Sequence, residues 1–552
     1  MAQNQSDLYL GLDLSTQQLK YTVINHDHDI IAEAAVHFDR DLPEFHTTNG
    51  AIAEGDVVTS PTLMWVKAID ILLERLSKNT DIKIENIKGI SGAGQQHGSV
   101  YWNKEGLETL ASLDVSRTLE DQLQGAFSVK QSPIWQDAST TSQCRSLENL
   151  VGGPQGLADL TGSKGYERFT GNQIAKLYEQ NPSAYDATAR ISLVSSFIAS
   201  VLLGQLAPVD VADGSGMNMM DIHTHKWIPS ILEHCGGKDL QKKLESEPVE
   251  GGTNLGAINS YFVTRYGFSS ECTIAPFTGD NPATLVSMNL EQGDCVVSLG
   301  TSDTMLMYLP EANPTTESHL MSHPTNPEAY MGMLCYKNGS LTREKIRDEY
   351  AEGDWTTFNN LLHQAPPGLS NGCNRRGYYY YMQEIIPFAK GFHRFENDIA
   401  VDEFTGTKEE VASYNVRAIV ESQFLSMKVR TSRMLDTHGK SSDASHLKRI
   451  LATGGAASNP NLLQVLSNVF NIPVYKKQGM NSASLGGALL AKFAVRRLHG
   501  YSGTFEQMME DEQRDKVAHQ LVAEPQAEYT EVYNDLVEGF VRLEQVVIAN
   551  TQ

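Results

Sequence analysis

Two short stretches of the chain each combine an apolar strand, a glycine and a hydroxyl-rich turn. They lie at residues 9–16 and 296–304, almost half the chain apart. Glycine lets the main chain approach an anion closely, so each turn can offer N–H groups and hydroxyls to phosphate oxygens. The candidate contacts are Gly11, Asp13, Ser15 and Thr16 in the first turn, and Gly300, Thr301 and Ser302 in the second. Strand-glycine-turn segments are common, but two at duplicated positions predict two lobes that hold one polyphosphate.

A third stretch suits the rest of a nucleotide. An apolar run from Arg449 ends at Gly454 and Gly455, and Asn459 follows as a plausible helix N-cap ahead of a proline. Apolar residues then recur at helical spacing, so strand, glycine turn and amphipathic helix follow in order. Such a turn suits a base and ribose lying on bare backbone. A tight strand-to-helix connection without a ligand explains the same residues.

Carboxylates stand beside both predicted phosphate positions. Asp280, in a Thr-Gly-Asp-Asn segment just before the second turn, is placed to accept a proton from an attacking hydroxyl. Asp13, inside the first turn, is better placed to hold Mg²⁺ through water, since Mg²⁺ prefers oxygen ligands and keeps much of its hydration. A helix N-cap for Asp280 and a turn residue for Asp13 are the structural alternatives.

Short strands and helices must position these residues. Strands are predicted over 8–13 and 20–24, a helix over 61–76, and a buried strand over 87–90 that leads into Gln95, Gln96 and His97. The predicted first lobe covers residues 1–290 and carries the first phosphate turn. The second covers 291–552 and begins with a strand at 295–299. No low-complexity linker separates them, so we expect closely packed lobes around a cleft, with a hinge near 289–293.

Composition restricts the function classes. The 552 residues carry 44 Lys and Arg against 67 Asp and Glu, a net charge of −23 that would repel a nucleic acid. No apolar run is long enough to span a bilayer, and the start of the chain lacks a basic leader. The six cysteines form no zinc-type or disulfide-type spacing, which favours a reducing compartment. We therefore expect a soluble, cytoplasmic enzyme with small-molecule ligands and no membrane or nucleic-acid partner; its oligomeric state stays open.

Familiar nucleotide motifs are absent from the sequence. The chain has no GxxxxGK[ST] loop, no protein-kinase HRD or DFG set, and no strand-bound GxGxxG. We therefore expect a nucleotide-binding site of another kind.

In combination the motifs resemble the FGGY family of sugar kinases, in family order through nearly the whole chain. The similar segments are GLDLSTQQLK at 11–20, GQQHGSVYW at 94–102, WQDAST at 135–140, TGSKGYERFTGNQI at 161–174, TGDNPAT at 278–284, SLGTSDT at 298–304 and ATGGAASNPNLLQVL at 452–466. Within the family they are most similar to the members that act on D-xylulose, in the longer animal and fungal form. The resemblance implies an α/β fold of two ribonuclease H-like, actin-like ATPase lobes with an ATP cleft. It also implies transfer of the γ-phosphoryl group of MgATP to O5 of D-xylulose.

The resemblance also implies roles for particular residues. By matching motif, Asp280 is the general base and contacts the sugar with Asn281, and His97 and Arg168 are further sugar contacts. The positions that match the adenosine site are Gly454, Gly455, Asn459 and, as a side chain that packs on the base, Trp355.

Some positions and alternatives stay open. Asp137 is followed by Ala-Ser where bacterial members usually have a basic residue, so its sugar contact is open, and so is the contact of Trp355 with the base. A lone His or Arg also serves often as a structural hydrogen-bonding residue. Two alternatives remain for the function: a kinase for another ketose or polyol such as L-ribulose, glycerol or gluconate, and a non-kinase actin-like ATPase.

Overall fold

The chain folds into two compact units. The computed structural model describes residues 6–244, 246–369, 373–435, 447–477, 482–513 and 519–551. Unit 1 comprises Met1–Asn289, Leu320–Met331 and Met480–Asp515, and unit 2 comprises Leu290–His319, Gly332–Gly479 and Lys516–Gln552. The first boundary falls beside the division at residue 290 expected from the sequence. Two later segments nevertheless group with unit 1. In the second of them, helix α19 (Ala483–Leu498) packs against the central strands of this unit.

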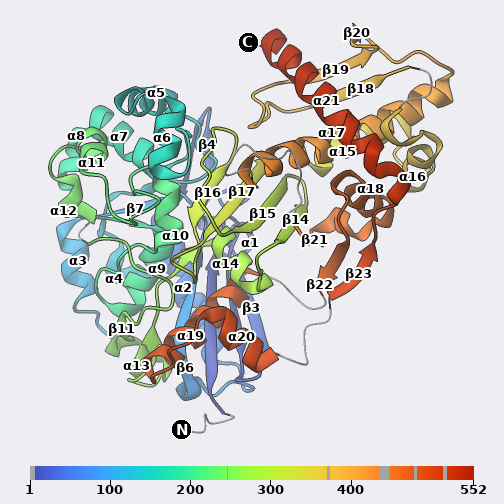
Figure 1. The fold of residues 1–552 in the computed structure, drawn as a ribbon. Helices are drawn as coiled ribbons and strands as arrows, with labels where there is room; N and C mark the ends of the chain where they lie inside the picture. Colours follow the sequence, from blue (N-terminus) through green and yellow to red (C-terminus); the bar gives the residue numbers. More distant parts are fainter. Residues whose placement is uncertain are drawn as a thin grey trace. The chain divides into compact units, whose positions relative to one another are not determined.

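A mixed sheet forms the centre of unit 1 (Figure 1). Its strands run in the order β11-β12-β6-β1-β2-β3, with β13 pairing to β6 beyond β12. β1 is antiparallel to β2 and parallel to β6, and β12 is parallel to β6. The strands are β1 (Leu8–Leu14), β2 (Gln18–Ile24), β3 (Ile30–His37), β6 (Ile87–Gly94), β11 (Gly256–Ala257), β12 (Thr273–Ile274) and β13 (Thr278–Gly279).

Strand β1 covers the predicted range of 8–13 and one further residue, so Gly11, named above as a contact in the first turn, lies inside the strand. It continues through Asp13 to Leu14, and the turn to β2 begins at Ser15, whose N–H donates to the Gln18 carbonyl at 3.0 Å. Gly11 makes room for a packed helix. A Cβ at Gly11 would lie 1.8 Å from the Ser484 carbonyl oxygen of α19, so only glycine lets this helix lie on the strand.

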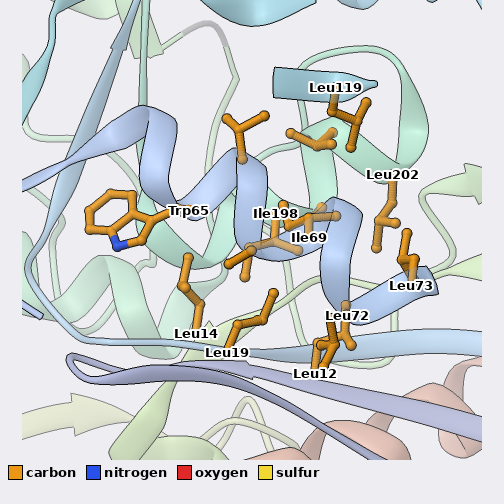
Figure 2. Close-up of a cluster of buried hydrophobic side chains, with 14 of the residues drawn as sticks. Leu12, Leu14, Leu19, Trp65, Ile69, Leu72, Leu73, Leu119, Ile198 and Leu202 are labelled. Carbon is orange, nitrogen blue, oxygen red and sulfur yellow. The ribbon is translucent and has the colours of Figure 1, made fainter. Parts of the chain in front are cut away.

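The core of unit 1 lies between this sheet and helices α2 (Thr62–Ser77) and α9 (Val194–Leu203). Figure 2 shows Trp65 and Ile69 of α2 with Leu12 and Leu14 of β1 and Ile198 of α9. All five side chains are at most 1% exposed. The predicted helix over 61–76 is therefore confirmed.

A second sheet forms the centre of unit 2, with strands in the order β17-β15-β14-β21-β22-β23. β14 is antiparallel to β15 and parallel to β21, and β22 is parallel to β21. The order and directions of β15-β14-β21-β22 match those of β2-β1-β6-β12 in unit 1, so the two units repeat one topology. The strands are β14 (Asp294–Leu299), β15 (Asp303–Leu309), β17 (Tyr330–Tyr336), β21 (Arg449–Thr453), β22 (Val474–Lys477) and β23 (His519–Ala523).

Smaller sheets and helices complete each unit. Unit 1 adds β4 (Ile52–Glu54), β5 (Val57–Pro61), β7 (Ser99–Trp102), β8 (Phe127–Val129), β9 (Gln131–Pro133), β10 (Arg190–Leu193), most of β16 (His319–Ser322), α1 (Phe38–Asp41), α3 (Lys104–Leu110), α4 (Leu119–Leu123), α5 (Thr141–Leu150), α6 (Pro154–Thr161), α7 (Thr170–Gln180), α8 (Pro182–Ala187), α10 (Val211–Gly214), α11 (Pro229–Gly236), α12 (Leu240–Leu244), α13 (Ser260–Tyr266), α14 (Asp280–Met288) and α20 (Phe505–Gln513). Unit 2 adds β18 (Arg375–Tyr380), β19 (Gly391–Glu396), β20 (Ile399–Val401), α15 (Ser340–Tyr350), α16 (Trp355–Gln364), α17 (Lys408–Leu435), α18 (Pro460–Phe470) and α21 (Thr530–Thr551). Within the described ranges no helix has both the length and the apolar character to cross a membrane.

Candidate active site

The two predicted carboxylates of unit 1 lie on either side of strand β6. Asp13 of β1 and Thr278 of β13 are both register partners of Ala93, and Asp280 follows two residues later at the start of α14. The carboxyl ends of parallel strands are a usual place for ligands in open α/β sheets. Asp13 and Asp280 are close enough to interact, since the charge of Asp280 contributes to the raised pKa of Asp13.

Both carboxylates have raised pKa values. Asp280 is partly open to solvent, yet the protein surrounds it closely enough for burial to raise its pKa to about 6, against hydrogen bonds from the Asn281 and Gln96 backbone. Burial and the charge of Asp280 raise the pKa of Asp13 to about 7. Two close carboxylates suit a proton acceptor beside a bound cation.

Asp13 fits the predicted Mg²⁺ role. Its Oδ1 atom is buried and has no hydrogen-bond partner among the described residues. A divalent cation would supply the missing partner and offset the repulsion from Asp280. Within the described ranges there is no group of three or more His, Cys, Asp or Glu residues that could hold a metal ion. An ion at Asp13 would therefore need water and phosphate oxygens as its other ligands.

Asn281 and Gln96 hold the Asp280 side chain in place. The Asn281 backbone N–H donates to Asp280 Oδ1 at 3.0 Å, and Asn281 Nδ2 lies 3.2 Å from the same oxygen. Asn281 Nδ2 also donates to Gln96 Oε1 at 2.9 Å. The carboxylate therefore has a fixed orientation at the N-terminus of α14, where the helix dipole favours its charged form.

His97 is held rigidly in the loop after β6. Its backbone lies in the left-handed region at φ 71°, and its ring stacks on Phe169 with centroids 4.5 Å apart. Nδ1 lies 2.9 Å from the Gly216 carbonyl oxygen, which can only accept, so Nδ1 carries the proton and Nε2 is left as an acceptor. Burial, with the charge of Arg168, lowers the pKa of His97 to about 3 and keeps the ring neutral. A neutral acceptor suits a sugar hydroxyl.

Arg168 belongs to the same cluster. Its guanidinium lies 5.0 Å from the Tyr166 ring centroid and 5.8 Å from that of Phe169, the ring on which His97 stacks. The predicted residues His97, Arg168, Asp280 and Asn281 thus all lie in unit 1, where Gln96 and His97 are adjacent in the loop after β6. A cation, a neutral imidazole and an amide together can bind a polyol through several hydroxyls.

Asp213 and Asp210 extend this cluster and were not predicted. Both are at most 1% exposed. Asp213 accepts from Ser195 Oγ, and Asp210 caps α10 and accepts from Thr278 Oγ1. Burial raises the pKa of Asp213 to about 8, with the charges of Asp210 and Asp280 adding to it. Asp213 Oδ1 lies close enough to Gln96 for that amide to lower this pKa, although the geometry falls short of a full hydrogen bond. The N-cap spacing of Asp210 is the only sequence signal for this pair.

Two further side chains of the sugar motifs have structural partners. The Asp137 carboxylate accepts from the Val58 N–H at 2.9 Å, from Gln173 Nε2 at 2.8 Å, and from the backbone and hydroxyl of Ser139. With four donors it has little capacity left for a sugar. Trp135 Nε1 donates to Thr16 Oγ1 at 2.9 Å, which joins the first phosphate turn to the sugar motifs.

The second phosphate turn and the glycine turn are neighbours in unit 2. They follow β14 and β21, which are parallel and paired up to Ser298 and Thr453. Gly454 adopts φ 86°, and a Cβ there would lie 2.5 Å from the Leu299 carbonyl oxygen, so a side chain would collide with the end of β14. Thr301, Ser302, Gly454 and Gly455 are exposed. Their backbone and hydroxyls are therefore available to one ligand at this edge of the sheet.

The remaining predicted nucleotide residues lie beside this edge. Asn459 caps α18 through Asn461 N at 3.0 Å, and its Nδ2 donates to Asn359 Oδ1 of α16 at 2.9 Å. Trp355 begins α16, half-buried, with the Arg347 guanidinium 4.8 Å from its ring centroid. The hydrogen bond between Asn459 and Asn359 thus links α16, which begins at Trp355, to the segment that follows the glycine turn.

Solved structures with the same fold cover the whole chain. The gluconate kinase of Lactobacillus acidophilus and the ligand-bound xylulose kinase of that bacterium each match with a TM-score of 0.78 and 16% identity over 99% of both chains. Identity this low shows the fold alone. It confirms the predicted fold class, two ribonuclease H-like lobes of the actin-like ATPase type.

The sequence comparisons give the family. The profile of the FGGY family of carbohydrate kinases matches residues 8–120 and 127–287 with its N-terminal domain and residues 295–495 with its C-terminal domain. The xylulose kinase of Rattus norvegicus is 43% identical over 546 residues, which cover 98% of this chain and 97% of the relative. The chain belongs to the FGGY family of carbohydrate kinases, and it is an enzyme.

Proposed function

We propose that this protein is an ATP-dependent kinase that converts D-xylulose to D-xylulose 5-phosphate. The name of the Rattus norvegicus relative supports the sugar. The observation that supports this most directly is the Asp280 carboxylate, which Asn281 orients and links to Gln96, the residue before the neutral His97. A non-kinase ATPase of this fold has no need of such a polyol cluster.

The residues of unit 1 suit the acceptor half of the reaction. Asp280 accepts the proton of the sugar hydroxyl as its oxygen attacks the γ-phosphorus. The bond between that phosphorus and the β–γ bridging oxygen breaks, and ADP leaves. Asn281, His97 and Arg168 bind the other hydroxyls and hold the attacking oxygen in line. Gly11 supports the sheet through its contact with α19, whereas Ser15 and Thr16 face the phosphate chain from the turn.

The residues of unit 2 suit the nucleotide half. Gly300, Thr301 and Ser302 bind phosphate oxygens through backbone N–H groups and hydroxyls. Gly454, Gly455 and Asn459 bind adenosine, with Trp355 against the base. Mg²⁺, when bound, neutralises charge on the β- and γ-phosphates, and Asp13 would hold it.

The six cysteines are free thiols. Free thiols and ATP consumption suit the cytoplasm, where we place the reaction.

Turnover of ATP with and without D-xylulose tests this function. We expect ADP release to depend on D-xylulose and to be much slower with L-ribulose, glycerol or gluconate. A gluconate kinase shares this fold, so the panel must include that sugar. Faster turnover with another acceptor would reassign the substrate. ATP hydrolysis that no sugar accelerates would instead favour a non-kinase ATPase.

A further inference from the structure

A buried ion pair lies directly behind the second phosphate turn. Asp303 follows Ser302, begins β15 and is 1% exposed. Arg343 of α15 is fully buried and forms a bidentate ion pair with Asp303. Its Nη1 donates to Oδ2 at 2.7 Å and its Nη2 donates to Oδ1 at 2.9 Å. This two-pronged geometry is the strong and directional form of the interaction.

The same arginine joins the turn to two helices. Its Nη2 donates to Ser340 Oγ at 2.9 Å and its Nη1 to Gln423 Oε1 of α17 at 2.6 Å. The Ser340 N–H in turn donates to the Gly300 carbonyl at 2.8 Å. Thus Arg343 contacts both Asp303, the residue directly after the turn, and Ser340, which donates to the first carbonyl of the turn.

The pair is tightly packed on the side of Gly339, and a cavity lined by Asp303, Asn338 and Gln423 adjoins it on another side. A Cβ on Gly339 would lie 2.6 Å from Asp303 Oδ1 and 2.8 Å from the Gly300 carbonyl oxygen. Gln423 Nε2 donates to the Asn338 carbonyl at 2.6 Å, so α17 also fixes the segment that leads into α15. Movement of Asp303 would therefore move the backbone of Gly300–Ser302.

We propose that Arg343 is a positioning residue that, through Asp303, fixes the phosphate-binding backbone of Gly300–Ser302. It does so without touching the nucleotide. The inference rests on the proposed function, in which this turn binds the phosphates of ATP. A buried ion pair is a weak source of stability, because desolvation offsets much of the attraction, so a role in fixing geometry explains it better. The guanidinium also neutralises a carboxylate that would otherwise repel a polyphosphate.

Arg343→Lys is the test, because lysine keeps the charge but loses the planar fork. Arg430→Lys is the matched control. Arg430 is also fully buried in unit 2 and pairs with Glu544 through two contacts, at 3.2 and 2.9 Å, but among the described residues no hydrogen bond or ion pair links it to the turn. Both variants should lower the melting temperature by similar amounts.

Only Arg343→Lys should weaken phosphate binding. We expect its Kd for ADP and its KM for ATP to rise about tenfold. This corresponds to losing roughly one charged hydrogen bond between the displaced turn and a phosphate. The Kd for adenosine and the KM for D-xylulose should stay within about twofold, because those contacts lie elsewhere. Arg430→Lys should leave all four constants within that range.

Two results would overturn the inference. One is an unchanged Kd for ADP in Arg343→Lys; the other is an equal loss for adenosine, which would indicate general damage to unit 2. Asp303→Asn, which keeps the shape of the side chain, provides the same comparison if Arg343→Lys does not fold. Direct ADP binding needs no sugar, so a wild-type protein that binds ADP but does not phosphorylate D-xylulose would contradict the proposed function and leave this inference testable.

Discussion

At the scale of single residues, the proposed role of Asp280 as the general base can be tested directly. Asp280→Asn keeps the size and several hydrogen bonds but cannot accept a proton. We expect kcat to fall by about 10²–10⁴-fold, the usual contribution of general-base catalysis, with ATP binding little changed. Steady-state rates and calorimetric ADP binding measure the two effects. Near-normal turnover in Asp280→Asn would show that another group accepts the proton.

His97 should affect the sugar more than the nucleotide. His97→Asn removes the Nε2 acceptor and the ring that stacks on Phe169. We expect a rise of about tenfold or more in the KM for D-xylulose, since one good hydrogen bond to a substrate is worth roughly that much. The KM for ATP should change far less, and Arg168→Ala should show the same pattern. Equal losses for both substrates would indicate a folding defect instead.

Asp213 should make stability depend on pH. Its pKa is about 8 in the folded protein and about 3.9 in an unfolded chain. The folded state therefore holds this proton more strongly, and the stabilisation is complete below pH 4 and lost as pH rises towards 8. Asp213→Asn stays neutral throughout. Its melting temperature relative to the wild type should be higher at pH 8.5 than at pH 5, and a difference that does not change with pH would contradict the assigned pKa.

The chemistry of the residues explains which of them could be predicted. The proposed role of Asp280 came from its type and its position beside the second turn, and those of Asn281 and His97 came from the family resemblance of their motifs. Asp213 has no such signal. Its importance comes from Ser195, Gln96 and Gly279, which only the fold brings to it, since a Cβ on Gly279 would lie 2.8 Å from Asp213 Oδ1.

At the scale of elements, strand ends were harder to predict than strands. β14 ends at Leu299, just before Gly300, whereas Gly11 lies inside β1, which ends at Leu14, one residue beyond the predicted end. Both glycines follow apolar residues, and the sequence does not distinguish them. The difference is tertiary: α19, which follows hundreds of residues later, needs the space at Gly11. Local patterns cannot report a contact with a distant helix.

This contact makes a stability prediction at the same scale. Gly11→Ala places a methyl group against the α19 backbone, and overpacking of this kind costs about 1–3 kcal/mol or more. Gly125→Ala is the matched control, because a Cβ there meets no atom within 4 Å. Denaturant unfolding should show a clear loss for Gly11→Ala and almost none for Gly125→Ala. Equal stability of the two variants would mean that α19 can shift without cost.

At the scale of the whole molecule, the duplicated topology was predictable and the division of the chain only partly so. The two hydroxyl-rich turns pointed to repeated lobes, and β1–β2 and β14–β15 are equivalent hairpins. A single boundary near 290 nevertheless could not anticipate that residues 320–331 and 480–515 group with unit 1. A continuous strand-and-helix pattern does not reveal on which sheet a late helix packs.

The reaction itself places a demand on both units. The proposed acceptor residues belong to unit 1 and the proposed nucleotide residues to unit 2, and phosphoryl transfer requires the acceptor oxygen in line with the γ-phosphate and water excluded. We therefore predict that D-xylulose and a non-hydrolysable ATP analogue together make the protein more compact, through movement near residues 289–293, where the chain first passes from one unit to the other. Small-angle scattering of the free protein, of each binary complex and of the ternary complex measures this. A radius of gyration that stays constant at confirmed saturation would contradict closure and favour a preformed arrangement.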